Sequence, residues 1–159
     1  MLSLPRPPLP LSAPPITTLL RWPVRLIPGA LHSQGLALVL NRLLAQALAE
    51  EALWFLDGRV LQIEVTDLGL DYRLTLEEGR LAAASAGRTP HVRFAGPLQA
   101  FLVLALGEED PDTLFFQRRL QLEGDTELGL EIKNFLYGME AGLLPPPLEG
   151  LARRLLEKL

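Results

Sequence analysis

Cysteine is absent from the 159-residue sequence, and aromatic residues make up only 6 % of it. The chain can therefore form neither a disulfide framework nor a thiolate metal site. No apolar run approaches the ~20 residues that a membrane-spanning helix needs, because the longest one covers only residues 100–106. Prolines near the start interrupt the apolar stretch that a signal peptide requires. We therefore expect a cytoplasmic protein whose core consists mainly of aliphatic side chains.

Residues suited to catalysis or metal binding are equally scarce. The two histidines, His32 and His91, have no acidic residue or second histidine at ligand spacing, so we expect no metal site. No serine lies in a nucleophile elbow, and the glycine-rich phosphate-binding motifs are missing. The acidic run at 108–110 lacks the alternating ligands of a calcium loop and fits a helix start better. The sequence therefore predicts no enzyme, no catalytic residue and no cofactor.

Charge is distributed unevenly along the chain. All 19 acidic residues follow residue 49, although the net charge of the whole chain is only −4. Residues 1–34 form a proline-rich leader that is basic and apolar, with Trp22 between Arg21 and Arg25. This composition favours an anionic lipid interface over nucleic acid. We expect these three residues to contact the inner membrane peripherally; a solvated tail and a strap packed across the domain are the alternatives.

Hydrophobic periodicity predicts an α+β fold. Each predicted strand is apolar on one face only, so helices must cover that face of a mostly antiparallel five-stranded sheet. We expect the folded domain to span residues 35–140, followed at 141–159 by a proline break and an amphipathic helix. The predicted strands cover 61–65, 70–76, 81–85, 92–94 and 120–123, and the predicted helices cover 35–56, 97–106, a segment starting at 110–112, 126–140 and 148–159.

The most informative stretch runs from a strand through a Glu-Gly-Asp turn into a helix. Gly124 frees the backbone for the turn, and Asp125 can accept hydrogen bonds from the first free amides of the helix. Asp125 and Glu127 could also be interpreted as general acids, but capping of the helix start accounts for both residues. The helix places a set of apolar side chains on one face, namely Leu128, Ile132, Phe135, Leu136 and Met139.

This strand, turn and helix, with Phe-Ala-Gly-Pro-Leu at 94–98 and the order of elements over 35–140, resemble the sterol carrier protein 2 (SCP-2) family, whose members bind lipids. Segments 26–31, 41–44 and 53–59 are similar to family members that act as accessory factors of oxygen-independent ubiquinone biosynthesis in bacteria. The resemblance implies a non-catalytic protein that binds a polyprenylated ubiquinone precursor or a phospholipid. It further implies that the protein acts together with ubiquinone-biosynthesis enzymes, including the UbiU–UbiV pair.

The resemblance also implies an apolar cavity between sheet and helices. Small residues at 81–86 allow either close helix packing or empty space, and the family fold favours the space. A ligand-free protein-interaction or dimerisation module of the same fold is the alternative. A residue of this kind is more often part of an ordinary core than of a lining. The residues expected at the lining are Leu40, Leu44, Leu48, Phe101, Phe115, Phe116, Leu128, Ile132, Phe135 and Leu136.

Overall fold

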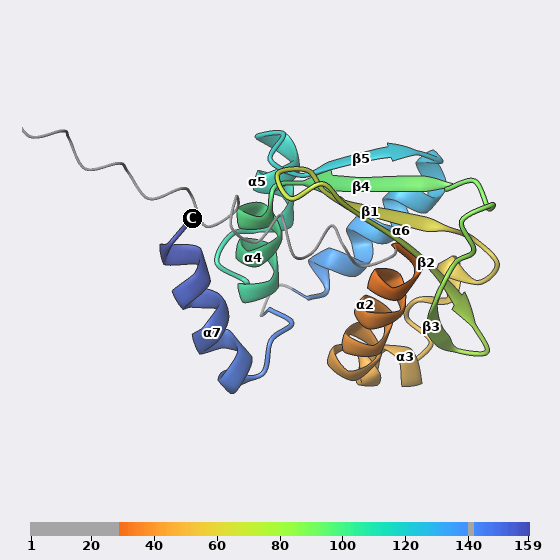
Figure 1. Ribbon diagram of the computed structural model, residues 1–159, viewed down its shortest axis with the longest axis horizontal. Helices are drawn as coiled ribbons and strands as arrows, with labels where there is room; N and C mark the ends of the chain where they lie inside the picture. Colours follow the sequence, from red (N-terminus) through yellow and green to blue (C-terminus); the bar gives the residue numbers. More distant parts are fainter. Residues whose placement is uncertain (1–28, 140–141) are drawn as a thin grey trace, which may run out of the picture.

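A computed structural model describes residues 29–139 and 142–159, and Figure 1 shows its five-stranded sheet with helices α2, α4 and α6 on one side. The strand order is β3-β2-β1-β4-β5. β1 and β4 pair in parallel and the other three pairs are antiparallel, which confirms the predicted α+β class and the mostly antiparallel sheet. The strands are β1 (Leu61–Val65), β2 (Leu70–Glu77), β3 (Arg80–Ala83), β4 (Val92–Gly96) and β5 (Gln121–Gly124).

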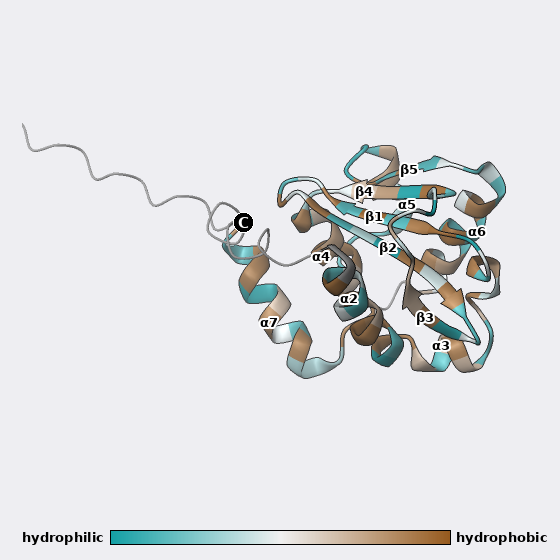
Figure 2. Cartoon of the chain, turned by 45° about the vertical axis from the view of Figure 1, so that its right-hand side comes forward, coloured by the Kyte–Doolittle hydropathy of each residue, from teal (hydrophilic) through white to brown (hydrophobic). Residues whose placement is uncertain are grey.

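The two faces of the sheet differ sharply in polarity. Strand alternation sends successive side chains to opposite faces, and Figure 2 shows hydrophobic and hydrophilic segments alternating along the strands. The register aligns one apolar-facing row across four strands, from Tyr72 through Ile63 and Phe94 to Leu122. On the other face Arg93 pairs with Glu64, with 2.6 Å between Nε and Oε2. The helices therefore cover the face that the sequence predicts to be apolar.

The helices connect and flank the strands. Their bounds are α2 (Gly29–Leu43), α3 (Ala45–Ala49), the 3-10 helix η1 (Trp54–Leu56), α4 (Leu98–Leu106), α5 (Pro111–Phe116), α6 (Thr126–Tyr137) and α7 (Pro146–Glu157).

The first helix departs from the predicted continuous helix over residues 35–56. α2 begins earlier, at Gly29, and the chain kinks at Leu44 before the short α3. Glu51 then adopts a left-handed conformation, with φ of 56°, and the Ala52 amide donates to the Ala47 carbonyl. This reversal ends the helix and allows Leu53 and Phe55 to turn inward as buried residues.

Both predicted helix caps are confirmed. The Asp110 carboxylate accepts from the Asp112 amide at 3.0 Å at the start of α5. Hydrogen bonds from Thr113 and Asp112 hold the pKa of Asp110 below its usual value. The Asp125 carboxylate accepts from the Leu128 amide at 2.9 Å at the start of α6. These carboxylates therefore have a structural role in satisfying free helix amides.

Thr75 should be a site where an apolar substitution stabilises the protein. Its side chain is fully buried at 0 % exposure, and its Oγ1 has no hydrogen-bond partner within the described part of the chain. An unsatisfied buried hydroxyl costs free energy that an isosteric methyl group does not. We expect Thr75→Val to raise the free energy of unfolding by about 1 kcal/mol, measured by urea denaturation.

Thr113 provides the matched control. Its hydroxyl donates to Asp110 Oδ2 at 2.8 Å, so Thr113→Val removes a hydrogen bond that is made. We expect this variant to lose about 1 kcal/mol. A loss of stability in Thr75→Val would contradict the prediction.

Candidate functional site: an apolar cavity under the sheet

A cavity of about 370 Å³ lies between the apolar face of the sheet and the helices. Its walls are aliphatic and aromatic, and Tyr72 supplies the single polar side-chain atom among the residues described there. The lining residues are Leu36, Val39, Leu40, Leu43 and Leu44 near α2; Leu53, Phe55 and Leu56 around η1; Leu61, Ile63, Val65, Leu68, Leu70, Tyr72, Leu74, Leu81 and Phe94 from the sheet and its turns; Leu98, Phe101, Leu102, Leu104 and Ala105 on α4; Ile132, Phe135 and Leu136 on α6; and Leu143 and Leu144 beyond it.

Polar side chains fix α2 above the sheet edge. The Ser33 hydroxyl, on a side chain only 4 % exposed, accepts from the Arg73 amide at 3.0 Å. The Asn41 side chain accepts from the Leu81 amide and donates to the Leu81 carbonyl, both at 2.9 Å. These bonds hold α2 over β2 and β3, so that Leu36 and Leu40 form one wall of the cavity.

α4 forms the opposite wall and is fixed at its start. The Leu98 amide donates to Asp67 Oδ1 at 2.9 Å, which joins the first turn of α4 to the β1–β2 connection. The Phe101 ring meets the Phe94 ring edge-on at a centroid distance of 5.1 Å. Sheet and helix therefore touch at these aromatic rings, beside the space that both elements line.

The segment after α6 closes the far end. Gly142 has a φ of 92°, and the next amide, that of Leu143, donates to the Ala105 carbonyl at 2.8 Å. The side chains of Leu143 and Leu144 therefore lie against α4 and in the cavity wall. α7 follows and packs on α4. Its Arg153 forms one ion pair with Glu108, just after α4, and a second with Glu149 on α7 itself.

The cavity reaches the protein surface at α2. Val39 lines it and yet is 50 % exposed, so this side chain lies at the rim. Leu38 beside it is 64 % exposed. A ligand longer than the cavity can therefore extend outward along apolar surface.

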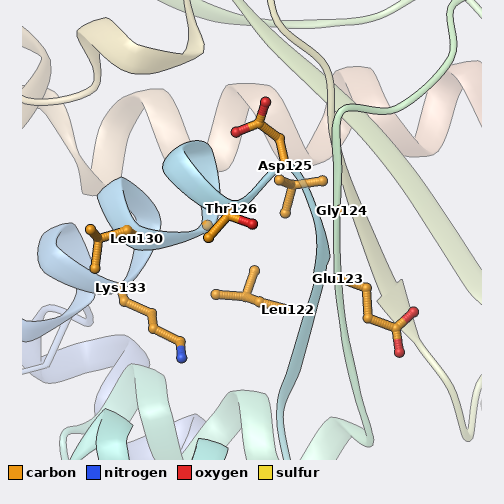
Figure 3. A pocket seen from close by; sticks show the side chains of 9 residues that line it. Leu122, Glu123, Gly124, Asp125, Thr126, Leu130 and Lys133 are labelled. Atoms are coloured by element: carbon orange, nitrogen blue, oxygen red, sulfur yellow. The ribbon is translucent and has the colours of Figure 1, made fainter.

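A second hollow, of about 290 Å³, lies outside the sheet–helix interior, beside β5 and the start of α6. Figure 3 shows Leu122 and Lys133 pointing toward each other across it, while the carboxylates of Glu123 and Asp125 point away. The Lys133 ammonium lies 5.0 Å from the centroid of the Phe115 ring. The carboxylates flanking Gly124 thus serve the turn and the cap, and the apolar interior is the stronger candidate for a binding site.

The sequence that forms most of this interior matches a known family. The model of the SCP-2 sterol transfer family matches residues 40–137. The chain belongs to the SCP-2 sterol transfer family.

Sequence relatives within this family are ubiquinone-biosynthesis accessory factors by name. The ubiquinone biosynthesis accessory factor UbiT of Escherichia coli strain K12 is 42 % identical over 131 residues, which cover 82 % of this chain and 75 % of UbiT. UbiT of E. coli O157:H7 matches with the same identity and coverage. Among solved structures, the UbiJ-SCP2 ubiquinone synthesis protein superposes with a TM-score of 0.53 at 19 % identity, covering 67 % of this chain and 93 % of that one. This last similarity concerns the SCP-2 fold alone.

Six of the ten residues predicted to line the SCP-2 cavity lie in its wall, namely Leu40, Leu44, Phe101, Ile132, Phe135 and Leu136. The other four lie elsewhere. Leu48 and Phe115 pack against the core from outside the cavity, and Leu128 is a core residue only 1 % exposed. Phe116 is 90 % exposed, so its predicted place in the lining is wrong. Arg21, Trp22 and Arg25 lie outside the described residues.

The sheet contributes much of the wall that the sequence-based lining omitted. Ile63, Leu70 and Tyr72 line the cavity, and all three lie within the predicted strands over 61–65 and 70–76. Leu143 and Leu144 carried no periodic signal, because they lie in the connection between two helices. None of the described helices combines the length and hydropathy that crossing a membrane requires.

Proposed function

We propose that the protein is a non-catalytic accessory factor of ubiquinone biosynthesis by the oxygen-independent pathway, and that it binds a polyprenylated ubiquinone precursor or another lipid in the apolar cavity. The observation that carries this proposal is the cavity wall, in which every side chain but that of Tyr72 is purely apolar. The 42 % identity to UbiT supports the assignment to ubiquinone biosynthesis.

An apolar cavity suits reversible exchange of lipid with a membrane. Burying a hydrocarbon tail from water is worth ~0.8 kcal/mol per CH₂ group. Moving the same tail from a bilayer gains almost nothing, because the bilayer interior is already apolar. The cavity therefore holds a lipid firmly against loss to water and still returns it to a membrane, as presentation to an enzyme requires.

The opening of the cavity at Val39 allows it to bind a ligand longer than the cavity itself. A volume of about 370 Å³ lies near the lower end of small-molecule pockets, which span roughly 300–1,000 Å³. A lipid with a long isoprenoid tail then enters the cavity only in part, and the remainder needs apolar surface outside it, of the kind that Val39 and Leu38 expose on α2.

The partners and location follow from the same proposal. The protein presents its lipid to ubiquinone-biosynthesis enzymes, including the UbiU–UbiV pair, from the cytoplasmic side of the inner membrane. The leader that precedes α2 contacts the membrane through Arg21, Trp22 and Arg25, and the part of the predicted leader from Gly29 onward belongs with the lipid-binding domain as the start of α2. The segment after residue 140 closes the cavity and continues into α7.

The decisive experiment is identification of the co-purified lipid. The full chain is purified without detergent, extracted with organic solvent and analysed by mass spectrometry. We expect a quinone precursor or a phospholipid at a stoichiometry approaching one per chain. Protein that carries no lipid, takes none up from vesicles and still binds its partner enzymes fully would instead favour the ligand-free interaction module.

A further inference from the structure

Tyr72 is chemically distinct within the cavity wall. It lies on β2 between Leu70 and Leu74, which line the same cavity, and its register partner on β1 is Ile63. Among the described lining residues it alone can donate or accept a side-chain hydrogen bond. Sites for small molecules typically use a few placed polar groups to orient an otherwise apolar ligand.

The Tyr72 hydroxyl is available for a ligand. The ring is held by an edge-on contact with the His32 ring, at a centroid distance of 5.9 Å and an interplanar angle of 81°. No hydrogen bond joins the hydroxyl to another residue in the described ranges, 29–139 and 142–159. Burial raises the pKa of Tyr72 above its usual value, so the hydroxyl keeps its proton at neutral pH and can donate it.

The cavity lining, to which His32 beside the Tyr72 ring does not belong, selects against a charged head group. The other described lining residues carry no ionisable side chain, so the wall offers no cation to a phosphate. An unpaired charge in an apolar interior costs far more than a neutral polar group that makes one hydrogen bond. The oxygen of a phenol or quinone is neutral and needs only one hydrogen bond, whereas a phosphate would bring an unpaired charge into the apolar interior.

The sheet register gives the direction of the tail. From Tyr72 the apolar row continues through Ile63 to Phe94, which meets Phe101 on α4. Neighbouring strands lie about 4.8 Å apart, so this row spans roughly 10 Å of apolar wall. A ligand anchored at Tyr72 can therefore lay its tail across β1 and β4 toward α4.

We propose that Tyr72 is the head-group anchor of the cavity: its hydroxyl hydrogen-bonds a neutral oxygen on the head of an amphiphilic lipid, such as a phenol or quinone, while the tail lies along Ile63 and Phe94. This inference rests on the proposed lipid binding and adds to it the orientation of the ligand and the chemical class of its head.

The test uses probes that differ only in the head. 4-Dodecylphenol and dodecylbenzene share one ring and one tail, and dodecyl phosphate carries a charge instead. Binding to the delipidated full chain is measured by displacement of a fluorescent fatty probe. We expect the wild type to prefer the phenol over both other compounds, and Tyr72→Phe to bind the phenol about five- to tenfold more weakly while its affinity for dodecylbenzene stays unchanged.

Tyr137→Phe is the matched control, because the Tyr137 hydroxyl bonds Asp112 and lies away from the cavity lining. This variant should bind all three probes as the wild type does. Thermal unfolding checks that Tyr72→Phe is folded, and His32→Phe, which keeps a ring beside Tyr72, should retain the preference for the phenol.

Two results overturn the inference in distinguishable ways. Equal binding of phenol and dodecylbenzene by both wild type and Tyr72→Phe shows that the cavity holds tails without an anchor at Tyr72. Failure of the wild type to bind any of the three probes overturns the lipid-binding function together with the anchor.

Discussion

Gly124→Ala should destabilise the fold by about 3 kcal/mol or more, because two separate costs fall on one methyl group. Gly124 has a φ of 122°, a conformation that side chains rarely adopt. A Cβ there would lie 2.4 Å from the His91 carbonyl oxygen and 3.1 Å from the Val92 Cα. Both neighbours are backbone atoms at the start of β4, which is paired on both sides, so neither can move aside. Urea denaturation of the variant measures the loss.

Gly129→Ala is the matched control, five positions further along the same segment. Gly129 lies within α6, and a Cβ there would meet no heavy atom within 4 Å. Because alanine favours the helix more than glycine does, we expect this variant to gain roughly 0.5–1 kcal/mol. Equal and small effects in the two variants would contradict the role assigned to Gly124.

Gly124 matters for the cavity because the turn at this residue determines the position and direction of α6. The Asp125 amide donates to the His91 carbonyl at 3.0 Å, and the Asp125 side chain caps the helix that follows. α6 then carries Ile132, Phe135 and Leu136 into the cavity wall. The residues of this turn do not line the cavity, but the turn determines where one side of the binding site lies.

Local patterns made most of the fold predictable. Alternation identified β1 and β2, and Asp110 and Asp125 marked the helix starts, because each signal depends only on residues close in sequence. The reversal at Glu51 was missed because a left-handed glutamate lacks the glycine that usually marks a helix end. The parallel pairing of β1 with β4 joins strands distant in sequence, for which no local signal exists.

The cavity lining was predictable only where a long helix faces the sheet. Ile132 and Leu136 follow the helical period and line the wall. Leu48 lies beyond the kink at Leu44, and Phe116 ends a helix too short to orient all its side chains inward. Ser33 and Asn41, which hold α2 in place, have no apolar period and could be recognised only from their hydrogen bonds to the sheet.

Ala105→Phe should abolish most lipid loading, at least tenfold, without destabilising the protein. Ala105 lines the cavity from α4, and only its backbone carbonyl takes part in the bond to Leu143. A phenyl ring placed there occupies space that the tail would use and buries further apolar surface. Were the interior already filled, the same ring would overpack it and cost about 1–3 kcal/mol. Lipid content by mass spectrometry and unfolding temperature together separate these two situations.

Ala45→Phe gives the control for this substitution, since Ala45 is exposed at the start of α3 and does not line the cavity. It should load lipid as the wild type does. If Ala105→Phe retained full loading and normal stability, the lipid would have to bind elsewhere, and the cavity would lose its assigned function. Reduced loading with an unchanged or higher unfolding temperature instead requires that the space beside Ala105 is open in the free protein and occupied by lipid in the complex. Only in that case does the added ring compete with the ligand and not with the core.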